Sequence, residues 1–233
     1  MNIQMIVFDM AGTTLCDADN AVAGAVVQAL RQIGCEITPD DVDPVMGMPK
    51  PLAIRVLLEQ NGHDATDDTV ARVHAAFQQR MIEHYRTSPT VREIPGTTEL
   101  FRELRRLGIR VTLDTGFDRP IADAIIHRLG WHSGLIDDSV TSDEVAHGRP
   151  DPEMIRVLME RAGIEDPSLV GKVGDSISDI EQGINAGCGF VGAIVGPRTR
   201  SMLMDPRVHP LERVSDLLRV LAMAGSPGRG GVL

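Results

Sequence analysis

Positive charge, aromatic side chains and cysteine are all scarce in this chain of 233 residues. The formal net charge is -10, and nucleic acid or an anionic membrane would require a basic surface, so we expect neither as a partner. Phe, Trp and Tyr supply only 3% of the residues, which leaves aliphatic side chains and Met to fill the core. No apolar run approaches the length of a membrane span. The composition is that of a globular protein.

The number and spacing of the cysteines indicate a reducing compartment. Cys16, Cys35 and Cys188 are odd in number and have no metal-ligand spacing, which is typical of a reducing environment. The sequence also enters its first apolar stretch without a basic and then apolar leader. We therefore expect a cytoplasmic protein.

The stretch from Met5 to Thr14, MIVFDMAGTT, organises the rest of the chain. Its apolar residues predict a buried strand that ends at Asp9, and Gly-Thr-Thr predicts a tight loop after it. In an open α/β sheet, ligands bind at the carboxyl ends of the strands, so a carboxylate there is placed for chemistry. The alternative is that Asp9 is only a turn or helix-cap residue.

Residues 16–88 contain no strand pattern. Apolar spacings of three and four, together with capping residues, predict helices over 20–33, from Thr38, over 51–60 and over 67–85. A helical block between a first strand and the rest of a sheet indicates an inserted cap domain. We predict packing or surface roles for the histidines of this block, His63, His74 and His84.

From residue 89 onward, strands and helices alternate, which implies a parallel sheet covered on both faces. The predicted strands are 109–113, 135–141, 169–173 and 190–195. The predicted helices are 97–107, 120–129, 152–162, 178–186 and 214–223. The fold class is therefore α/β, a Rossmann-like parallel sheet core with an inserted helical cap. The predicted parts are a core of 1–15 and 89–224, a cap of 16–88 and a flexible tail of 225–233.

Three predicted strands end in acidic or hydroxyl residues. The first ends at Asp9, the second at Asp114-Thr115-Gly116, and the third at Gly174-Asp175-Ser176, with Asp179 close behind. These ends share one edge of a parallel sheet, so acids far apart in sequence meet in one cleft. Carboxylates such as Asp9 and Asp175 are hard oxygen ligands suited to Mg²⁺. The alternative for Asp175 and Asp179 is a helix cap and a first-turn acid.

Four segments together resemble the motifs of the haloacid dehalogenase superfamily, in order and over nearly the whole chain. They are Asp9 in its Asp-x-x-Gly-Thr-Thr frame, Thr115, the segment Gly148-Arg149-Pro150-x-Pro152, and Gly174-Asp175-Ser176-x-x-Asp179. The resemblance implies a Rossmann-like core, an aspartate nucleophile, Mg²⁺ and a helical cap after the first motif.

Further details resemble the phosphonoacetaldehyde hydrolases, or phosphonatases, of that superfamily. Ala11 stands where the superfamily's phosphatases carry a second Asp, and Arg149 stands where most relatives carry Lys. The segment Met46-Gly47-Met48-Pro49-Lys50 matches a Met-Gly-x-x-Lys motif whose lysine forms an imine with the substrate aldehyde. A phosphate ester expels an alkoxide, which a general acid assists. A C–P bond would expel a carbanion, and an imine on Lys50 would delocalise that charge into an enamine.

The resemblance implies a role for each matched residue. Asp9 would attack phosphorus, Lys50 would bind the aldehyde, and Thr115 and Arg149 would stabilise the phosphoryl oxygens. Mg²⁺ would be held by Asp9, the Ala11 carbonyl and Asp175, with Asp179 supporting the metal's waters or Arg149. The residues expected to contact substrate are Gly12 and Thr13 through their amides, Met46, Gly47 and Gly116.

The implied reaction is Mg²⁺-dependent C–P cleavage of phosphonoacetaldehyde or a related phosphonate to acetaldehyde and phosphate. The chain departs from the phosphonatase pattern at Met10, where the family has Trp, at Ala53, where it has His, and at Cys188-Gly189, where it has Met-Trp. One alternative is a phosphatase that acts on a small phosphate ester without the second Asp and without need of Lys50. Another is a regulatory module that binds phosphate and Mg²⁺ but forms no aspartyl phosphate. By analogy with phosphonatases, a homodimer through the cap is possible.

Overall fold

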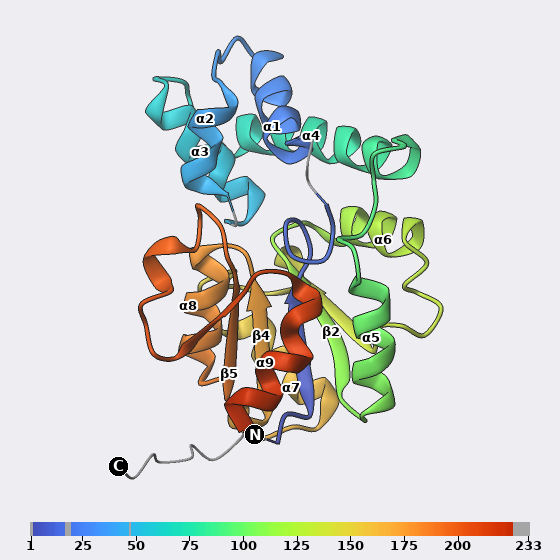
Figure 1. Cartoon of the computed structure of the whole chain (residues 1–233). Helices are drawn as coiled ribbons and strands as arrows, with labels where there is room; N and C mark the ends of the chain where they lie inside the picture. Colours follow the sequence, from blue (N-terminus) through green and yellow to red (C-terminus); the bar gives the residue numbers. More distant parts are fainter. Residues whose placement is uncertain (1, 17–19, 47, 226–233) are drawn as a thin grey trace.

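The computed structural model describes residues 2–16, 20–46 and 48–225. A six-stranded parallel sheet lies at its centre, with strand order β3-β2-β1-β4-β5-β6 (Figure 1). The strands are β1 (Met5–Asp9), β2 (Arg110–Thr115), β3 (Asp138–Thr141), β4 (Val170–Gly174), β5 (Phe190–Ile194) and β6 (Val208–Leu211). The predicted α/β fold with a Rossmann-like parallel sheet is confirmed.

Helices cover both faces of the sheet, as the crossovers between parallel strands require. They are α5 (Thr97–Arg106), α6 (Arg119–Arg128), α7 (Glu153–Ala162), α8 (Ile177–Ala186) and α9 (Leu217–Gly225). Short 3₁₀ turns are η2 (Ser142–Glu144), η3 (Pro167–Leu169), η4 (Arg200–Met202) and η5 (Val214–Asp216). Alternate residues of β1 face opposite ways. Ile6 and Phe8 join the cluster that includes α5 and α9, whereas Met5 and Val7 pack with α7.

Two details near the C-terminus differ from the sequence-based expectation. Strand β6 was not predicted because Pro210 interrupts its pattern, but an edge strand tolerates a proline whose missing N–H would face away from the sheet. The single helix predicted over 214–223 is a 3₁₀ turn, η5, followed by α9. Gly225, predicted to begin the tail, is the last residue of α9, and the rest of that tail lies outside the described residues.

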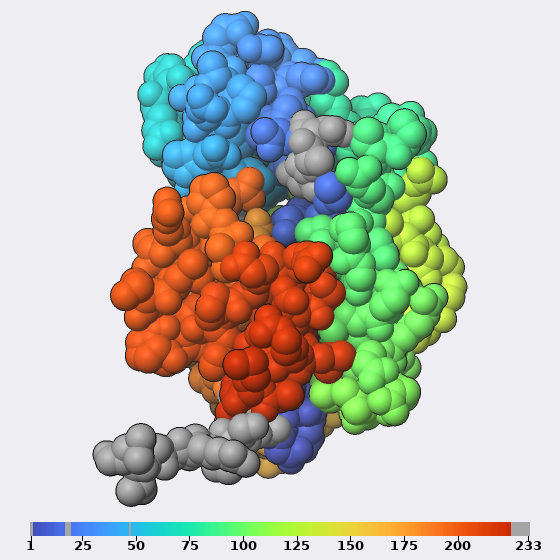
Figure 2. Space-filling view, in the orientation of Figure 1, coloured from blue at the N-terminus to red at the C-terminus, as the bar shows by residue number. Residues whose placement is uncertain are grey.

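We call helices α1 to α4 the cap. They are α1 (Ala21–Arg31), α2 (Pro39–Val42), α3 (Lys50–Gln60) and α4 (Asp67–Thr87), with the turn η1 (Asp43–Val45) between α2 and α3. The cap lies over the carboxyl edge of the sheet as a separate lobe (Figures 1 and 2). Among the described residues, no helix combines the length and the apolar character needed to cross a membrane.

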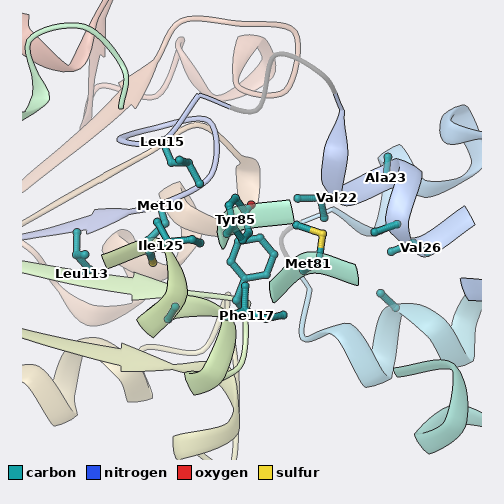
Figure 3. Packing of buried hydrophobic residues seen from close by; sticks show 14 of the residues in the cluster. Met10, Leu15, Val22, Ala23, Val26, Met81, Tyr85, Leu113, Phe117 and Ile125 are labelled. Atoms are coloured by element: carbon teal, nitrogen blue, oxygen red, sulfur yellow. The ribbon is translucent and has the colours of Figure 1, made fainter. Parts of the chain in front are cut away.

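Apolar side chains join the cap to the core. Met81 and Tyr85 of α4 belong to the same buried cluster as Met10 and Phe117 of the core (Figure 3). The rings of Tyr85 and Phe117 meet edge to face, with centroids 5.9 Å apart. Such contacts between aromatic rings add to the gain from burial. The cap is therefore packed against the core directly above the strand ends.

Candidate active site

The strand ends bring the predicted acids together. Asp9 on β1 pairs in register with Asp114 on β2, and both side chains are buried, with 4% and 0% of their surface exposed. On the other side of β1, β4 ends at Gly174, and Asp175 follows it directly. The carboxyl edge of three neighbouring strands thus carries three acids, as the parallel arrangement predicts.

The loop after β1 places its own side chains against Asp175. Gly12 has φ +97°, and a Cβ at this position would lie 2.3 Å from Asp175 Oδ2, so only glycine fits without displacement. Thr13 Oγ1 lies 3.3 Å from Asp9 Oδ2 and 3.3 Å from Asp175 Oδ1. The loop therefore sets the spacing between the Asp9 and Asp175 carboxylates.

The amides predicted to hold substrate are turned inward in this conformation. The Gly12 N–H donates to the Leu15 carbonyl at 2.8 Å, and the Thr13 N–H donates to the Met10 carbonyl at 3.3 Å. These bonds close the tight turn that the Gly-Thr-Thr sequence forms. The expected amide contacts of Gly12 and Thr13 with substrate stay predictions, and in this structure both amides shape the loop.

A buried ionic network connects the strand ends. Arg149 Nη1 donates to Asp9 Oδ1 at 2.7 Å and also pairs with Asp179 Oδ1. Lys172 Nζ lies 3.1 Å from the same Asp179 oxygen and forms a second ion pair with Asp114. Each of these five side chains is at most 6% exposed. Ion pairs removed from solvent in this way are screened little, so the arrangement fixes the orientation of Asp9.

Asp179 combines the two roles considered for it. Its Oδ2 accepts hydrogen bonds from the Ser176 amide at 3.2 Å and from the Ser176 hydroxyl at 2.5 Å, which completes a capping box at the start of α8. Its Oδ1 accepts from Arg149. The expected support of Arg149 by Asp179 and the alternative of a first-turn acid therefore both describe this residue, while Ser176 and not Asp175 is the N-cap of α8.

Lys172 and Arg198 were not singled out in the sequence. Lys172 lies inside an apolar strand, where no local pattern distinguishes a buried lysine from one at a strand edge. The scarcity of lysine is a signal that the sequence does offer, because the chain contains only two lysines, Lys50 and Lys172. The structure buries both of them. Arg198, in the loop after β5, lines the cleft with its Nη1 3.2 Å from Asp175 Oδ2. An arginine in a loop of weak pattern gave no such signal.

Burial and repulsion make Asp9 and Asp175 difficult to ionise. Burial, and then the charge of Asp179, raises the pKa of Asp9 to about 6, although Arg149 acts in the opposite direction. Burial, and then the charges of Asp9 and Asp179, raises the pKa of Asp175 to about 8. Burial also opposes ionisation of Asp179, but the neighbouring Arg149 and Lys172 outweigh it and hold its pKa well below the ordinary value.

Two groups of carboxylate oxygens at the strand ends could hold a divalent cation. Oxygens of Asp9, Asp114 and Asp179 lie within 4.8 Å of one another, but Oδ1 of each already pairs with Arg149 or Lys172. In contrast, Asp9 Oδ2 and Asp175 Oδ1 each lie 3.3 Å from Thr13 Oγ1, and the cation beside this pair is Arg198, which contacts the other oxygen of Asp175 at 3.2 Å. The donor set consists of hard oxygens, which suits Mg²⁺.

The cap contributes Lys50 to the same cleft. Lys50 is the first residue of α3 and is 4% exposed, with its Nζ 5.7 Å from the centre of the Phe117 ring and 3.4 Å from the Met48 carbonyl. Thr115 accepts a hydrogen bond from the Phe117 amide at 3.1 Å, which orders the loop after β2. The predicted residues that line one cleft are Asp9, Ala11, Met46, Lys50, Thr115, Gly116, Arg149, Asp175 and Asp179. Gly47, also predicted, lies outside the described residues.

The sheet and cleft define an α/β enzyme with its site at the carboxyl edge of the strands. A family model described as haloacid dehalogenase-like hydrolase matches residues 3–187, and the chain belongs to this family. The superfamily assignment made from the four motifs is confirmed.

Curated relatives carry a more particular name. The phosphonoacetaldehyde hydrolase of Bacillus cereus strain AH187 is 29% identical over 209 residues, which cover 84% of this chain and 77% of that protein. The bifunctional phosphonoacetaldehyde hydrolase/aminoethylphosphonate transaminase of Clostridioides difficile strain 630 is 30% identical over 204 residues, or 83% of this chain. The chain spans only 32% of the length of that bifunctional protein.

Solved structures share the fold. A phosphonoacetaldehyde hydrolase-like protein from Oleispira antarctica has a TM-score of 0.82 at 20% identity, covering 96% of this chain and 93% of that one. A predicted phosphoglycolate phosphatase from Haemophilus somnus 129PT has a TM-score of 0.76 at 18% identity, covering 95% and 99%. At such identities the likeness shows the fold and leaves the substrate open.

Proposed function

We propose that the protein cleaves the C–P bond of phosphonoacetaldehyde or a closely related small phosphonate. The observation that carries this proposal is the position of Lys50, which is buried in the same cleft as Asp9 and Arg149. Ala11, at the place of a general acid, lines that cleft as well. An amine close to the nucleophile, without a second acid, suits a reaction that stabilises a carbanion rather than an alkoxide.

In the proposed reaction, the Lys50 amine condenses with the substrate aldehyde and releases water, which forms an imine. The Asp9 carboxylate then forms a bond to phosphorus as the C–P bond breaks, and the electron pair of that bond moves into the imine, protonated on nitrogen, to give a neutral enamine. Protonation of the enamine carbon and hydrolysis release acetaldehyde and free Lys50. Water then attacks the aspartyl phosphate and releases phosphate.

The other residues of the cleft hold charge in place. Arg149 orients the attacking carboxylate through Asp9 Oδ1 and lies where it can also neutralise phosphoryl oxygens. Hydrolases of this family generally use Mg²⁺, and Asp9, Asp175 and the Ala11 carbonyl would hold the ion. When bound, it would neutralise these carboxylates and polarise the phosphoryl group.

The cleft is narrow in this structure. Its cavity volume of about 40 Å³ has room for roughly three water molecules at the usual requirement of 10–15 Å³ each. Phosphonoacetaldehyde and a small phosphate ester are both larger than this, so entry of either substrate would require the cap to move away from the core.

A phosphatase activity is the second candidate, and one observation favours it. Ala53, where phosphonatases have His, is 1% exposed and offers no polar group one turn after Lys50. If Lys50 were only a charge beside the phosphoryl group, the protein would hydrolyse a small phosphate ester.

Trapping the imine distinguishes the two candidates. The protein is incubated with phosphonoacetaldehyde and Mg²⁺ and reduced with borohydride, and the adduct is located by peptide mass spectrometry. With only two lysines in the chain, and with Lys172 fully buried, an adduct at Lys50 is unambiguous. We expect this adduct, together with release of acetaldehyde and phosphate that is lost in Lys50→Met. Equal turnover of a phosphate ester by both proteins, with no adduct, would favour the phosphatase.

A further inference from the structure

A polar contact between the cap and the core is centred on Asp118. This residue occupies the N-cap position of α6 and is only 3% exposed, yet its side chain does not cap its own helix. Instead, its Oδ2 accepts a hydrogen bond from Gln78 Nε2 at 2.5 Å and lies 2.8 Å from His74 Nε2. Both partners belong to α4, so one core carboxylate binds two side chains of the cap.

The spacing of the two partners lets both of them reach Asp118 from one face of α4. His74 and Gln78 are four residues apart and therefore lie on the same face of α4, one turn from each other. Burial opposes ionisation of Asp118, but the close contact with His74, the hydrogen bond from Gln78 and the charge of Lys50 outweigh it and lower its pKa. Hydrogen bonds to an ionised carboxylate are stronger than neutral ones and more sensitive to geometry. His74 is thus more than the packing or surface residue predicted from the sequence.

This contact lies next to the proposed imine lysine. Phe117, which precedes Asp118, has its ring 5.7 Å from Lys50 Nζ, and the charge of Lys50 acts on Asp118 itself. Beside Lys50, Pro49 rests on Gly148, where a Cβ would lie 2.5 Å from Pro49 Cγ. The cap is therefore seated against the core by an apolar contact at Pro49 and by a polar contact at Asp118.

We propose that Asp118 is a positioning residue that, through His74 and Gln78, holds the cap against the core and keeps Lys50 inside the cleft. The importance of this role for catalysis rests on the proposed function, in which Lys50 binds the substrate. The placement of Lys50 itself does not depend on which substrate is used. The two ideas can therefore fail separately.

The test measures how fast Lys50 reacts with an amine reagent. The substrate-free protein is treated briefly with acetic anhydride, and acetylation of Lys50 and Lys172 is followed by peptide mass spectrometry. Lys172 is an internal reference because it is completely buried and its ion-pair partners, Asp114 and Asp179, both belong to the core. In Asp118→Ala, loss of the hydrogen bond from Gln78 and of the ion pair with His74 should raise the acetylation rate of Lys50 about tenfold, with Lys172 unchanged. His74→Ala should raise the acetylation rate of Lys50 less than Asp118→Ala does. His74→Gln keeps a hydrogen-bond donor and should raise the rate less than His74→Ala.

A matched control lies on the same helix. Asp123 is an exposed acid of α6 paired with Arg119, so Asp123→Ala should leave Lys50 at the wild-type rate. The proposal is wrong if Asp118→Ala and Asp123→Ala react alike, or if Lys50 and Lys172 speed up together, which would indicate general loosening. If Asp118→Ala does not fold, His74→Ala and Gln78→Ala give the same comparison. Absence of a borohydride adduct in the wild-type protein would instead refute the proposed function, and the positioning role of Asp118 would still hold.

Discussion

Replacement of Lys172 by methionine tests the buried ionic network most directly. Lys172 and Asp114 are both 0% exposed, and their ion pair is shared with Asp179, whose oxygen lies 3.1 Å from Lys172 Nζ. Burial works against the charge on Lys172, but Asp114 and Asp179 outweigh it and raise its pKa, so the lysine is charged in the folded protein. Methionine has a similar length and no charge, and therefore leaves Asp114 without a cationic partner.

The expected loss is large. Removing one partner of a buried ion pair costs about 3–5 kcal/mol, because the remaining charge stays in the interior without compensation. Domains of this size are stable by roughly 5–15 kcal/mol, so Lys172→Met should lose at least about a fifth of the free energy of unfolding. The double variant Lys172→Met/Asp114→Asn removes the uncompensated charge and should recover at least half of that loss.

Urea unfolding followed by tryptophan fluorescence measures this. Trp131 is the only tryptophan and is fully buried, so its emission reports loss of the core. The control is Arg161→Met, which breaks a pair with Asp138 that is exposed on both sides, and it should change stability by less than about 1 kcal/mol. The reasoning fails if Lys172→Met is as mild as this control, or if the double variant is no more stable than Lys172→Met alone.

Two further predictions concern the metal side of the cleft. The pKa values of Asp175 and Asp9 are raised to about 8 and about 6, so these carboxyl groups must lose their protons before a cation binds. The affinity for Mg²⁺ should therefore fall as the pH is lowered from 8.5 to 6. Calorimetric titration in two buffers measures both the affinity and the protons released. An affinity that does not change with pH would contradict this. Gly12→Ala should weaken both Mg²⁺ binding and stability more than Gly34→Ala, because both glycines have positive φ but only Gly12 lies against Asp175. If both variants lose the same stability, about 1–2 kcal/mol, backbone strain alone would explain the effect.

The residues at the strand ends could be predicted because sequence and topology act together there. A short apolar run ending in an acid fixes the position of Asp9 along its strand, and parallel strands then bring Asp175 to the same edge. Arg149 followed from the family motif, since nothing in its local pattern indicates an ion pair with β1. Where a motif and a strand end coincide, the structure matches the expectation.

The remaining contacts depend on tertiary packing that no local pattern contains. Lys172 lies in a strand with apolar neighbours, and its partner Asp114 is 58 residues away on another strand. His74 and Asp118 are likewise separated in sequence, and the interleaved polar positions of α4 do not show which of them face the core. The inward bonds of the Gly12 and Thr13 amides depend on the exact course of one loop. In each case, the deciding partner is set by how the elements pack.

The balance of charge links these unpredicted contacts to the chemistry of the cleft. Asp9, Asp114, Asp175 and Asp179 bring four carboxylates to the strand ends, and Arg149, Lys172 and Arg198 each form an ion pair with at least one of them. Arg149 and Lys172 both pair with Asp179 and hold its pKa well below the ordinary value. Burial and the neighbouring acids instead raise the pKa of Asp9 to about 6 and that of Asp175 to about 8. The two buried cations therefore favour the ionised form of Asp179 and leave Asp9 and Asp175 as the acids whose charge a divalent cation would stabilise.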